Sequence, residues 1–352
     1  MIAANRQPRP SPSIRMQLAS TWPTLVPEDN RDISMLFLAK HAGTDVAFDP
    51  VDGNHAAYHR EIGDSLADAG FDLTRSADIT ALVDNDQRFG YVFSLMNRLG
   101  FRNSEVLVSA LCERTHVPYL GARPIVRGVA GDKHYTKVLF TRAGAMTPYW
   151  VVVRAGREPP SSLLPSPDGY VVKPVASSAS WGLSYQDSPD AALEALTRLA
   201  VTGVDALCEA FIPGVNLTLP VFGAVGLTYL PLVEEFVDDG ANIISNDSKR
   251  GFAASCDRSI VRDGALIEAA TTIAAAVLPD FLPFDYGRLD FRYDPHTGVM
   301  HVLEFNIACN LQRSKAVAIA AEECAISHTE LVAGIVAQSL ERQAGLTRPK
   351  IY

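Results

Sequence analysis

Residues 286–306, which read YGRLDFRYDPHTGVMHVLEFN, constrain the fold of this chain more than any other stretch. Two runs of alternating polarity lie on either side of the breaker cluster DPHTG at 294–298. This pattern predicts a β-hairpin, because strand side chains alternate with a period of two and turns collect Asp, Pro and Gly.

The hairpin is expected to bring four polar side chains to one face of a sheet. Successive side chains of a strand point to opposite faces, so Arg288 and Asp290 share a face, as do Glu304 and Asn306 on the return strand. With the turn centred near His296, Arg288 is expected opposite Glu304, and Asp290 is the diagonal neighbour. Two carboxylates and an amide can converge there on small cations. The simpler interpretation is a solvated sheet face.

Length and composition limit the classes of protein to consider. A chain of 352 residues with 47% hydrophobic content can bury a substantial core and is long enough for two or three domains. The net charge of −9 argues against a nucleic-acid partner. The sequence has no run of about 18 apolar residues, so no membrane-spanning helix and no membrane partner are expected.

The opening residues and the cysteines bear on the compartment. Residues 1–31 are expected to form a disordered leader, because their start is rich in Pro, Ser and Arg and lacks the apolar stretch of a secretory signal. The five cysteines are dispersed and include no CxxC pair. Reduced thiols in the cytoplasm are therefore expected, without a zinc site or a disulfide framework.

Strand and helix patterns divide the rest of the chain into three parts. Residues 32–125 alternate apolar strands with helical spacing, which predicts an N-terminal α/β domain with a parallel sheet. Residues 126–215 contain a lysine-bearing helix, a Pro-rich loop and two strands. Residues 216–345 contain longer strands, the hairpin and helices at about 264–277 and 314–340.

The stretch YVVKPVASSASWG at 170–182 combines a strand lysine with a loop of small residues. Lys173 ends the strand, and small side chains lead from there to Gly182. Small residues let backbone N–H groups approach phosphate oxygens, which favours a phosphate site. The alternative is an ordinary surface loop, and the sequence is not a Walker A motif.

A carboxylate lies near the end of another apolar strand, in LCEAFIPG at 207–214. With its apolar neighbours Phe211 and Ile212, Glu209 can accept an amino proton from a purine. The simpler interpretation is a carboxylate at the mouth of a strand.

Taken in order, these motifs resemble the ATP-grasp superfamily, and most closely its D-alanine–D-alanine ligase branch. The resemblance spans about residues 85–340 and rests on five motifs in the family's order. They are HVPYLG at 116–121, Asp132-Lys133 with Lys137, Lys173 with Gly182, Glu209 to Gly214, and GRLD at 287–290 with EFN at 304–306.

The resemblance implies an α/β ATP-grasp fold in which the central and C-terminal parts clamp ATP and the N-terminal domain binds substrate. Two Mg²⁺ ions, with Mn²⁺ as an alternative, are expected on Asp290, Glu304 and Asn306. The implied catalytic residues are Arg288, which steadies charge on a tetrahedral intermediate, and Lys249 on a mobile loop. The implied ATP-binding residues are Lys133, Lys173, Ser177, Ser178, Ser180, Gly182, Glu209, Ala210, Phe211, Ile212 and Asn216.

The family's activity joins a carboxylate to an amine. The acid attacks the γ-phosphate of ATP to give an acyl phosphate, and the amine then displaces phosphate to form an amide. Magnesium and lysines neutralise charge during the phosphoryl transfer. The loops around 177–181 and 240–255 are expected to close over the intermediate and exclude water.

The sequence departs from the family at the substrate pockets. Ala179 and Arg250 replace a serine and a tyrosine, and Asn216 replaces the acid that binds ribose. Candidate substrate residues are Arg250, Asn310 and Ser314, and Arg313 and Lys315 add further cations nearby. His55 and His59 are four apart without further ligands, so a structural or surface role is expected.

These departures favour small amino-acid-like substrates in specialised metabolism. The alternatives are an authentic D-alanine–D-alanine ligase of cell-wall synthesis and an ATP-binding regulatory protein without turnover. The resemblance also implies a homodimer among the expected oligomeric states, since relatives are often dimers.

Overall fold

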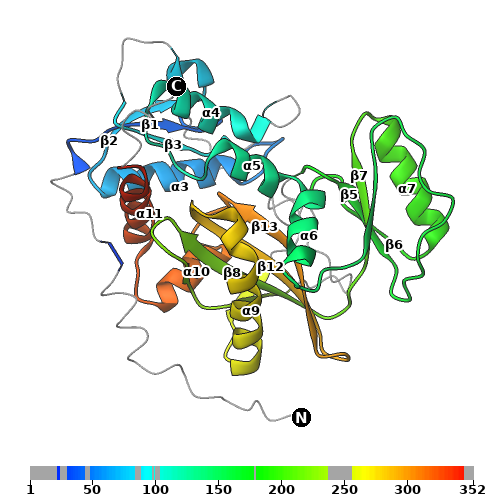
Figure 1. Ribbon diagram of the computed structural model, residues 1–352. Coiled ribbons are helices and arrows are strands. Elements are labelled where there is room, and N and C mark those ends of the chain that lie inside the picture. The colour runs from blue at the N-terminus through cyan, green and yellow to red at the C-terminus, as the bar shows by residue number, and fades with distance from the viewer. Residues whose placement is uncertain are drawn as a thin grey trace, which may run out of the picture.

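The computed structural model describes residues 22–23, 30–43, 48–83, 89–96, 99, 104–177, 180–236 and 256–344. Within these residues the strands form three sheets, and helices pack on each of them (Figure 1). Lys249, Arg250, Ser178 and the loop expected at 240–255 lie outside the described residues.

The N-terminal sheet is parallel and has the order β2-β1-β3, so its first strand is central. Leu36, Phe37 and Leu38 are fully buried, which explains why an unbroken apolar run forms the middle strand. The strands and helices of this region are β1 (Ser34–Leu38), α3 (His55–Asp68), β2 (Asp72–Ser76), η1 (Ile79–Leu82), β3 (Tyr91–Ser94), η2 (Ser104–Val106) and α4 (Leu107–Thr115).

Trp22 lies within the expected disordered leader, yet it is buried. Its indole N–H donates to the carbonyl oxygen of Glu330 at 2.9 Å, and its ring packs edge-on against Phe222. A Cβ at Gly334 would lie 2.1 Å from the indole nitrogen, so the glycine makes room for the ring. The expectation of disorder is therefore wrong for Trp22, because a single tryptophan in a Pro- and Ser-rich run gives no periodic signal.

A second, antiparallel sheet has the order β4-β7-β5-β6 and is covered by α7 (Figure 1). Helix α7 (Pro189–Val201) begins where Ser188 accepts a hydrogen bond from the backbone N–H of Ala191, with proline at its first position. The strands are β4 (Trp150–Val153), β5 (Tyr170–Pro174), β6 (Ser184–Gln186) and β7 (Ala206–Ala210). Helices α5 (Pro124–Gly131) and α6 (Lys133–Arg142) precede this sheet in the chain.

The third sheet has six strands in the order β11-β10-β8-β12-β13, with β9 paired to β8. One face packs on α9 through an apolar cluster that includes Leu219, Leu289 and Phe305. The other face carries Arg288 and Asp290, and its Tyr286 packs in the cluster shared with the N-terminal domain. The elements are β8 (Val215–Gly223), β9 (Thr228–Tyr229), β10 (Val233–Phe236), β11 (Asp257–Ile260), α9 (Gly264–Val277), η3 (Leu278–Phe281), β12 (Phe284–Asp294) and β13 (Val299–Ile307).

The predicted hairpin is present as β12 and β13, but the expected register is wrong. Asp290 pairs with Glu304, and Arg288 pairs with Asn306. The pairing shifts between Asp290 and Phe291, which is opposite Val302, so Leu303 is an extra residue on β13. Such a β-bulge lets Val302 face the core while Glu304 faces the polar side with Asp290.

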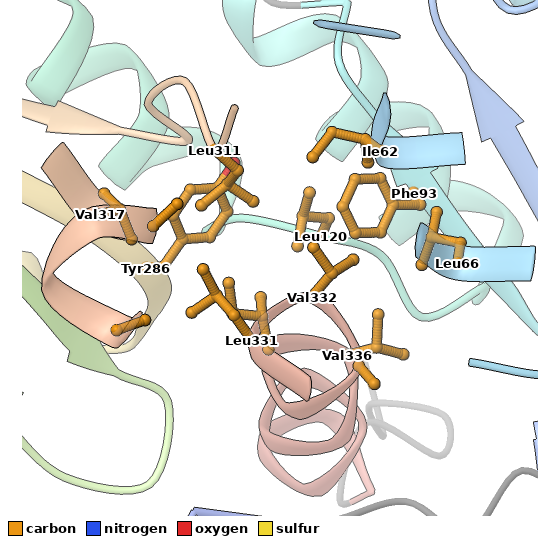
Figure 2. Packing of buried hydrophobic residues seen from close by; sticks show 14 of the residues in the cluster. Ile62, Leu66, Phe93, Leu120, Tyr286, Leu311, Val317, Leu331, Val332 and Val336 are labelled. Carbon is orange, nitrogen blue, oxygen red and sulfur yellow. The ribbon is translucent and has the colours of Figure 1, made fainter. Parts of the chain in front are cut away.

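Two C-terminal helices join the N-terminal domain to the third sheet. Helix α11 (His328–Gln343) inserts Leu331, Val332 and Val336 between side chains of α3, β3 and β12 (Figure 2). Helix α10 (Ala316–Glu323) adds Val317 to the same cluster. One core therefore spans both parts of the molecule.

In the described part of the chain, the segment Gly264–Phe281 is long and apolar enough to meet a length-and-composition test for a membrane span. Such a result is weak evidence by itself, because core helices pass the same test. Ala270, Ala274 and Val277 pack in the cluster beneath the third sheet, and 28% of the segment is buried.

Candidate active site

A polar row crosses the centre of the third sheet. Thr218, Asp290 and Glu304 are cross-strand neighbours on β8, β12 and β13. The Thr218 hydroxyl donates to Asp290 Oδ1 at 2.8 Å. The Asn306 amide donates to Asp290 Oδ2 at 2.8 Å and to Glu304 Oε1 at 3.0 Å. The structure thus brings the three predicted metal ligands together.

Arg288 lies beside this row. Its Nε is 3.2 Å from Asp290 Oδ1, and both side chains are largely buried. Burial by itself lowers the pKa of Arg288, but the Asp290 and Glu235 carboxylates outweigh this effect and raise the pKa above its ordinary value. The Arg288 guanidinium therefore stays positively charged next to the carboxylates of Asp290 and Glu235.

The chemistry of this donor set fits a hard cation. Carboxylate and amide oxygens are the ligands that Mg²⁺ prefers, and Mg²⁺ commonly completes its octahedron with phosphate oxygens and water. No cluster of three or more His, Cys, Asp or Glu suited to a metal occurs among the described residues. Asp290, Glu304 and Asn306 are thus a set that a phosphate-bearing substrate would complete, rather than an all-protein metal cage.

Lys133 connects the row to the predicted phosphate loop. It opens helix α6, where Asp132 caps the helix by accepting from the N–H groups of His134 and Tyr135. The buried ammonium donates to the carbonyl oxygen of Ser177 at 2.8 Å and lies 3.6 Å from Glu304 Oε2. One cation therefore contacts both the loop and a proposed metal ligand.

Glu209 on β7 of the second sheet lies between Lys137 of helix α6 and Lys173 of strand β5. Its Oε2 is 2.8 Å from Lys137 Nζ, and its Oε1 pairs with Lys173. Burial raises the pKa of Glu209, but the charges and hydrogen bonds of Lys137 and Lys173 outweigh burial and hold the pKa below its ordinary value. The carboxylate predicted to face adenine is thus an ion-pair partner of both lysines.

The structure adds Lys137 to the site, although the sequence did not predict it as a site residue. Its side chain is fully buried. Its ammonium also donates to Thr147 Oγ1 at 2.8 Å and lies 5.5 Å from the centre of the Trp150 ring. A sequence signal existed, since Lys137 is four positions after Lys133 and therefore on the same face of α6.

The predicted phosphate loop has two described residues with positive φ. Ser180 and Gly182 have φ values of 56° and 69°. A Cβ at Gly182 would lie 2.9 Å from the Pro174 ring, so a close approach requires the glycine there. The carbonyl of Ser177 faces Lys133, and the neighbouring Trp181 is 53% exposed.

The predicted adenine segment lies where the chain passes from the second sheet to the third. Ala210 ends β7, and the Phe211 N–H donates to the carbonyl oxygen of Gly169 at 3.0 Å. The carbonyl of Ile212 and the side chain of Asn216 both accept from Arg292. Arg292 was missed, although it continues the alternation of Arg288 and Asp290 on β12.

The predicted substrate residues after β13 take part in local contacts. Asn310 Oδ1 accepts from the backbone N–H of Gln312 at 2.8 Å, and the Ser314 carbonyl accepts from Arg258 at 3.1 Å. The backbone N–H of Arg313 donates to Glu61 Oε1 of α3. Burial lowers the pKa of Lys315 to about 8, with the neighbouring cation of Arg258 adding to the effect.

His59 belongs to a buried polar cluster at the end of β1. Its Nδ1 accepts from the backbone N–H of His41 at 3.2 Å, and His41 Nε2 lies 3.0 Å from Asp52 Oδ2. Burial, with the nearby His55, lowers the pKa of His59 to about 3. The ring is therefore neutral and hydrogen-bonded, as a structural histidine would be.

Comparison of the sequence with known proteins finds relatives of this chain. No family model matches the chain. The uncharacterized protein y4sG of Sinorhizobium fredii is 30% identical over 264 residues, 73% of this chain and 76% of that protein. A D-alanine–D-alanine ligase of Gluconobacter oxydans is 28% identical over 250 residues, 69% of this chain and 79% of the ligase.

Solved structures share the fold over most of their length. The D-alanine–D-alanine ligase from Bacillus anthracis, solved as a complex with ATP, has a TM-score of 0.69 at 16% identity. The match covers 89% of this chain and 99% of that one. The VanG D-Ala:D-Ser ligase from Enterococcus faecalis has a TM-score of 0.64 at 14% identity, with 87% and 98% covered.

The chain belongs to the ATP-grasp superfamily, in its D-alanine–D-alanine ligase branch. This membership confirms the predicted ATP-grasp fold and the predicted enzyme class, an ATP-dependent ligase that forms C–N bonds. The assignment of the two antiparallel sheets, which contain Glu209 and Asp290, to the two parts that clamp ATP stays a prediction.

Proposed function

We propose that the protein is a carboxylate–amine ligase that forms an amide through an acyl phosphate, acting on amino-acid-like substrates in specialised metabolism. The observation that carries this proposal is the row of Asp290, Glu304 and Asn306 with Arg288 held against it. A protein that only binds ATP has no need of a fixed cation beside the phosphate-side carboxylates.

Each residue of the row and its neighbours is given a proposed role. Asp290, Glu304 and Asn306 would hold Mg²⁺, which supplies charge neutralisation on the ATP phosphates. Lys133 orients the phosphates, because its buried ammonium lies between the loop and Glu304. Arg288 stabilises the negative oxygen that develops when the amine attacks the acyl phosphate. Lys249 is proposed as a further phosphate contact from its motif alone.

The proposed nucleotide seat follows the family motif on residues of the second sheet and its exits. Lys173 belongs to the phosphate side, and the backbone of 210–212 to the base side. The remaining proposed contacts are Ser177, Ser178, Ser180, Gly182, Glu209 and Asn216. The division into 32–125, 126–215 and 216–345 and a cytoplasmic location are part of the same proposal.

The substrate proposal rests on the departures around the hairpin exit. The segment that follows β13 carries Arg313 and Lys315, and Arg258 donates to the carbonyl oxygen of Ser314 within it. These cations favour a substrate that carries an anionic group, with Arg250, Asn310 and Ser314 as proposed contacts. D-Alanine as the only substrate is the second candidate, because relatives at 25–28% identity are named D-alanine–D-alanine ligases.

The test is ADP release from the purified protein with Mg-ATP and pooled D- and L-amino acids, with hydroxylamine present to trap an acyl phosphate as hydroxamate. Asp290→Asn is expected to lower the rate of ADP release about 100-fold or more, because a metal-held phosphate charge is lost. Asp280→Asn, at an exposed site on η3, is the control and is expected to retain full activity.

Splitting the pool then identifies the acid, and D-alanine alone tests the second candidate. ATP binding without ADP release from any acid–amine pair would contradict the ligase proposal.

A further inference from the structure

The segment 211–214, called the link, joins the second sheet to the third. Strand β7 ends at Ala210 in the second sheet, and β8 begins at Val215 in the third. The link would therefore be free to change shape unless other elements held it.

Arg292 on β12 makes one polar contact with the link and one with the start of β8. Its Nε donates to the carbonyl oxygen of Ile212 at 2.8 Å, and its Nη1 donates to Asn216 Oδ1 at 2.7 Å. The guanidinium also lies 5.0 Å from the centre of the Phe211 ring, which forms a T-shaped pair with Tyr185. Arg292 is only 4% exposed, so these contacts are made away from water.

A glycine provides an independent second attachment of the link to the hairpin. Gly214 has φ of +108°, and a Cβ there would lie 2.2 Å from the carbonyl oxygen of Tyr293. The backbone of the link thus packs directly on β12, one residue beyond Arg292. Only glycine permits this approach in this conformation.

Arg292 also relates the link to the metal side of the site. It lies two positions after Asp290 on the same face of β12, in the next row across the sheet. The link and Asp290, one of the three proposed metal ligands, are therefore held by the same strand.

We propose that Arg292 is a positioning residue for the nucleotide base, which fixes the backbone of 210–212 at a set place relative to Asp290. This inference rests on the proposed function, because it assumes that the base of ATP lies against the link. Arg292 acts through the link and is not a catalytic residue.

The proposal makes base binding and phosphate binding separable. Arg292→Met removes both hydrogen bonds and the contact with Phe211 while retaining much of the side-chain volume. We expect the affinity for Mg-ATP to fall about 10- to 100-fold, which corresponds to the loss of hydrogen bonds from a charged donor. The affinity for Mg-tripolyphosphate, which has the phosphates without the base, should change less than about twofold.

The experiment measures both affinities by competition against a fluorescent ATP analogue, with the full-length protein. Arg262→Met is the matched control, since Arg262 pairs with Glu323 away from the link, and both affinities should stay at the wild-type values. Arg292→Lys keeps a cation but cannot donate in two directions from one plane, so it should give an intermediate ATP affinity.

A second variant, Phe211→Leu, removes the ring that Arg292 contacts and leaves the cation in place. It should also weaken Mg-ATP selectively, and the double variant should lose less than the sum of the two effects. Equal weakening of ATP and tripolyphosphate, or unchanged ATP affinity in both single variants, would overturn the inference. Failure of the wild-type protein to bind Mg-ATP would instead overturn the proposed function on which it rests.

Discussion

Glu209 is the residue on which two buried cations depend. Lys137 and Lys173 are almost completely buried, and Glu209 is the carboxylate that pairs with both. The Coulomb attraction offsets the cost of removing three charges from water, so the arrangement is stable only while all three are present. Its value to function is that it fixes Lys173 at the start of the phosphate loop.

Glu209→Gln is expected to destabilise the protein by about 3–5 kcal/mol, because it leaves two buried cations without their counter-charge. Chemical denaturation at pH 7 measures this change. Glu194→Gln on the exposed face of α7 is the matched control and should change the free energy of unfolding by less than about 0.5 kcal/mol.

The same substitution should alter the dependence of stability on pH. The pKa of Glu209 is lower in the folded protein than its ordinary value of 4.5, so the unfolded chain takes up the proton first as the pH falls. The stability contributed by Glu209 is then present above about pH 4.5 and is lost below it. The difference between wild type and Glu209→Gln should narrow as denaturation is repeated at lower pH. A constant difference would contradict this assignment.

Residue-level prediction from the sequence worked where the spacing was local. Alternation alone placed Asp290 on the face of Arg288, and Glu304 on the face of Asn306. Arg292 continued the same pattern, but it belongs to no motif and was passed over. The sequence around Glu209 did not predict its ion pairs with Lys137 and Lys173, because the three side chains meet only through tertiary packing.

At the scale of single elements, the bulge in β13 decides which side chains reach the metal side. Hairpin alternation predicts the faces only in a regular ladder, and one extra residue reverses every side chain beyond it. The sequence does not mark Leu303 as that residue, because no glycine accompanies it. The pattern therefore predicted the two strands and the turn, but it could not predict the register of the pairing.

Helix α11 shows an element whose beginning is encoded locally. Ser327 Oγ accepts from the Glu330 N–H at 3.3 Å, and Glu330 Oε2 accepts from the Ser327 N–H at 2.7 Å, which is a capping box. Ser327→Ala should lower the free energy of unfolding by about 1 kcal/mol. Urea denaturation measures the change. Ser327→Asn, which can still cap the helix, should restore most of it, and equal losses in both variants would argue against the capping role.

At the scale of the whole molecule, Asp285 joins the N-terminal domain to the C-terminal sheet. It is fully buried and pairs with Arg342 of α11, 2.6 Å from Nε to Oδ1. Its Oδ2 accepts from the Gly121 N–H at 2.6 Å and from the Ser339 hydroxyl at 2.7 Å. Three segments distant in the sequence therefore share one carboxylate.

Asp285→Asn is expected to cost about 3–5 kcal/mol, because Arg342 would remain buried without its counter-charge. Thermal and chemical unfolding measure the loss. Adding Arg342→Met removes the unpaired cation, so the double variant should be more stable than Asp285→Asn alone. Simple additivity of the two substitutions would show that Asp285 and Arg342 are not coupled.

Prediction of the whole molecule depended on motif order more than on patterns of polarity. The parallel sheet of 32–125 followed from alternating strands and helices, and the ATP-grasp arrangement followed from five motifs in sequence. The core shared by α3, α11 and β12 could not be predicted, since no local signal says which helix faces which sheet (Figure 2).

The placement of the proposed metal ligands on one hairpin has a consequence for protein engineering. Arg288, Asp290, Glu304 and Asn306 all lie within β12 and β13, so exchange of a single contiguous segment between homologues carries the entire set. The nucleotide side draws on α6, β5, β7 and the link, and its transfer requires several separate exchanges. Chimeras with boundaries at the two ends of the hairpin should therefore keep the proposed metal ligands together. The residues of the nucleotide side can then be varied separately.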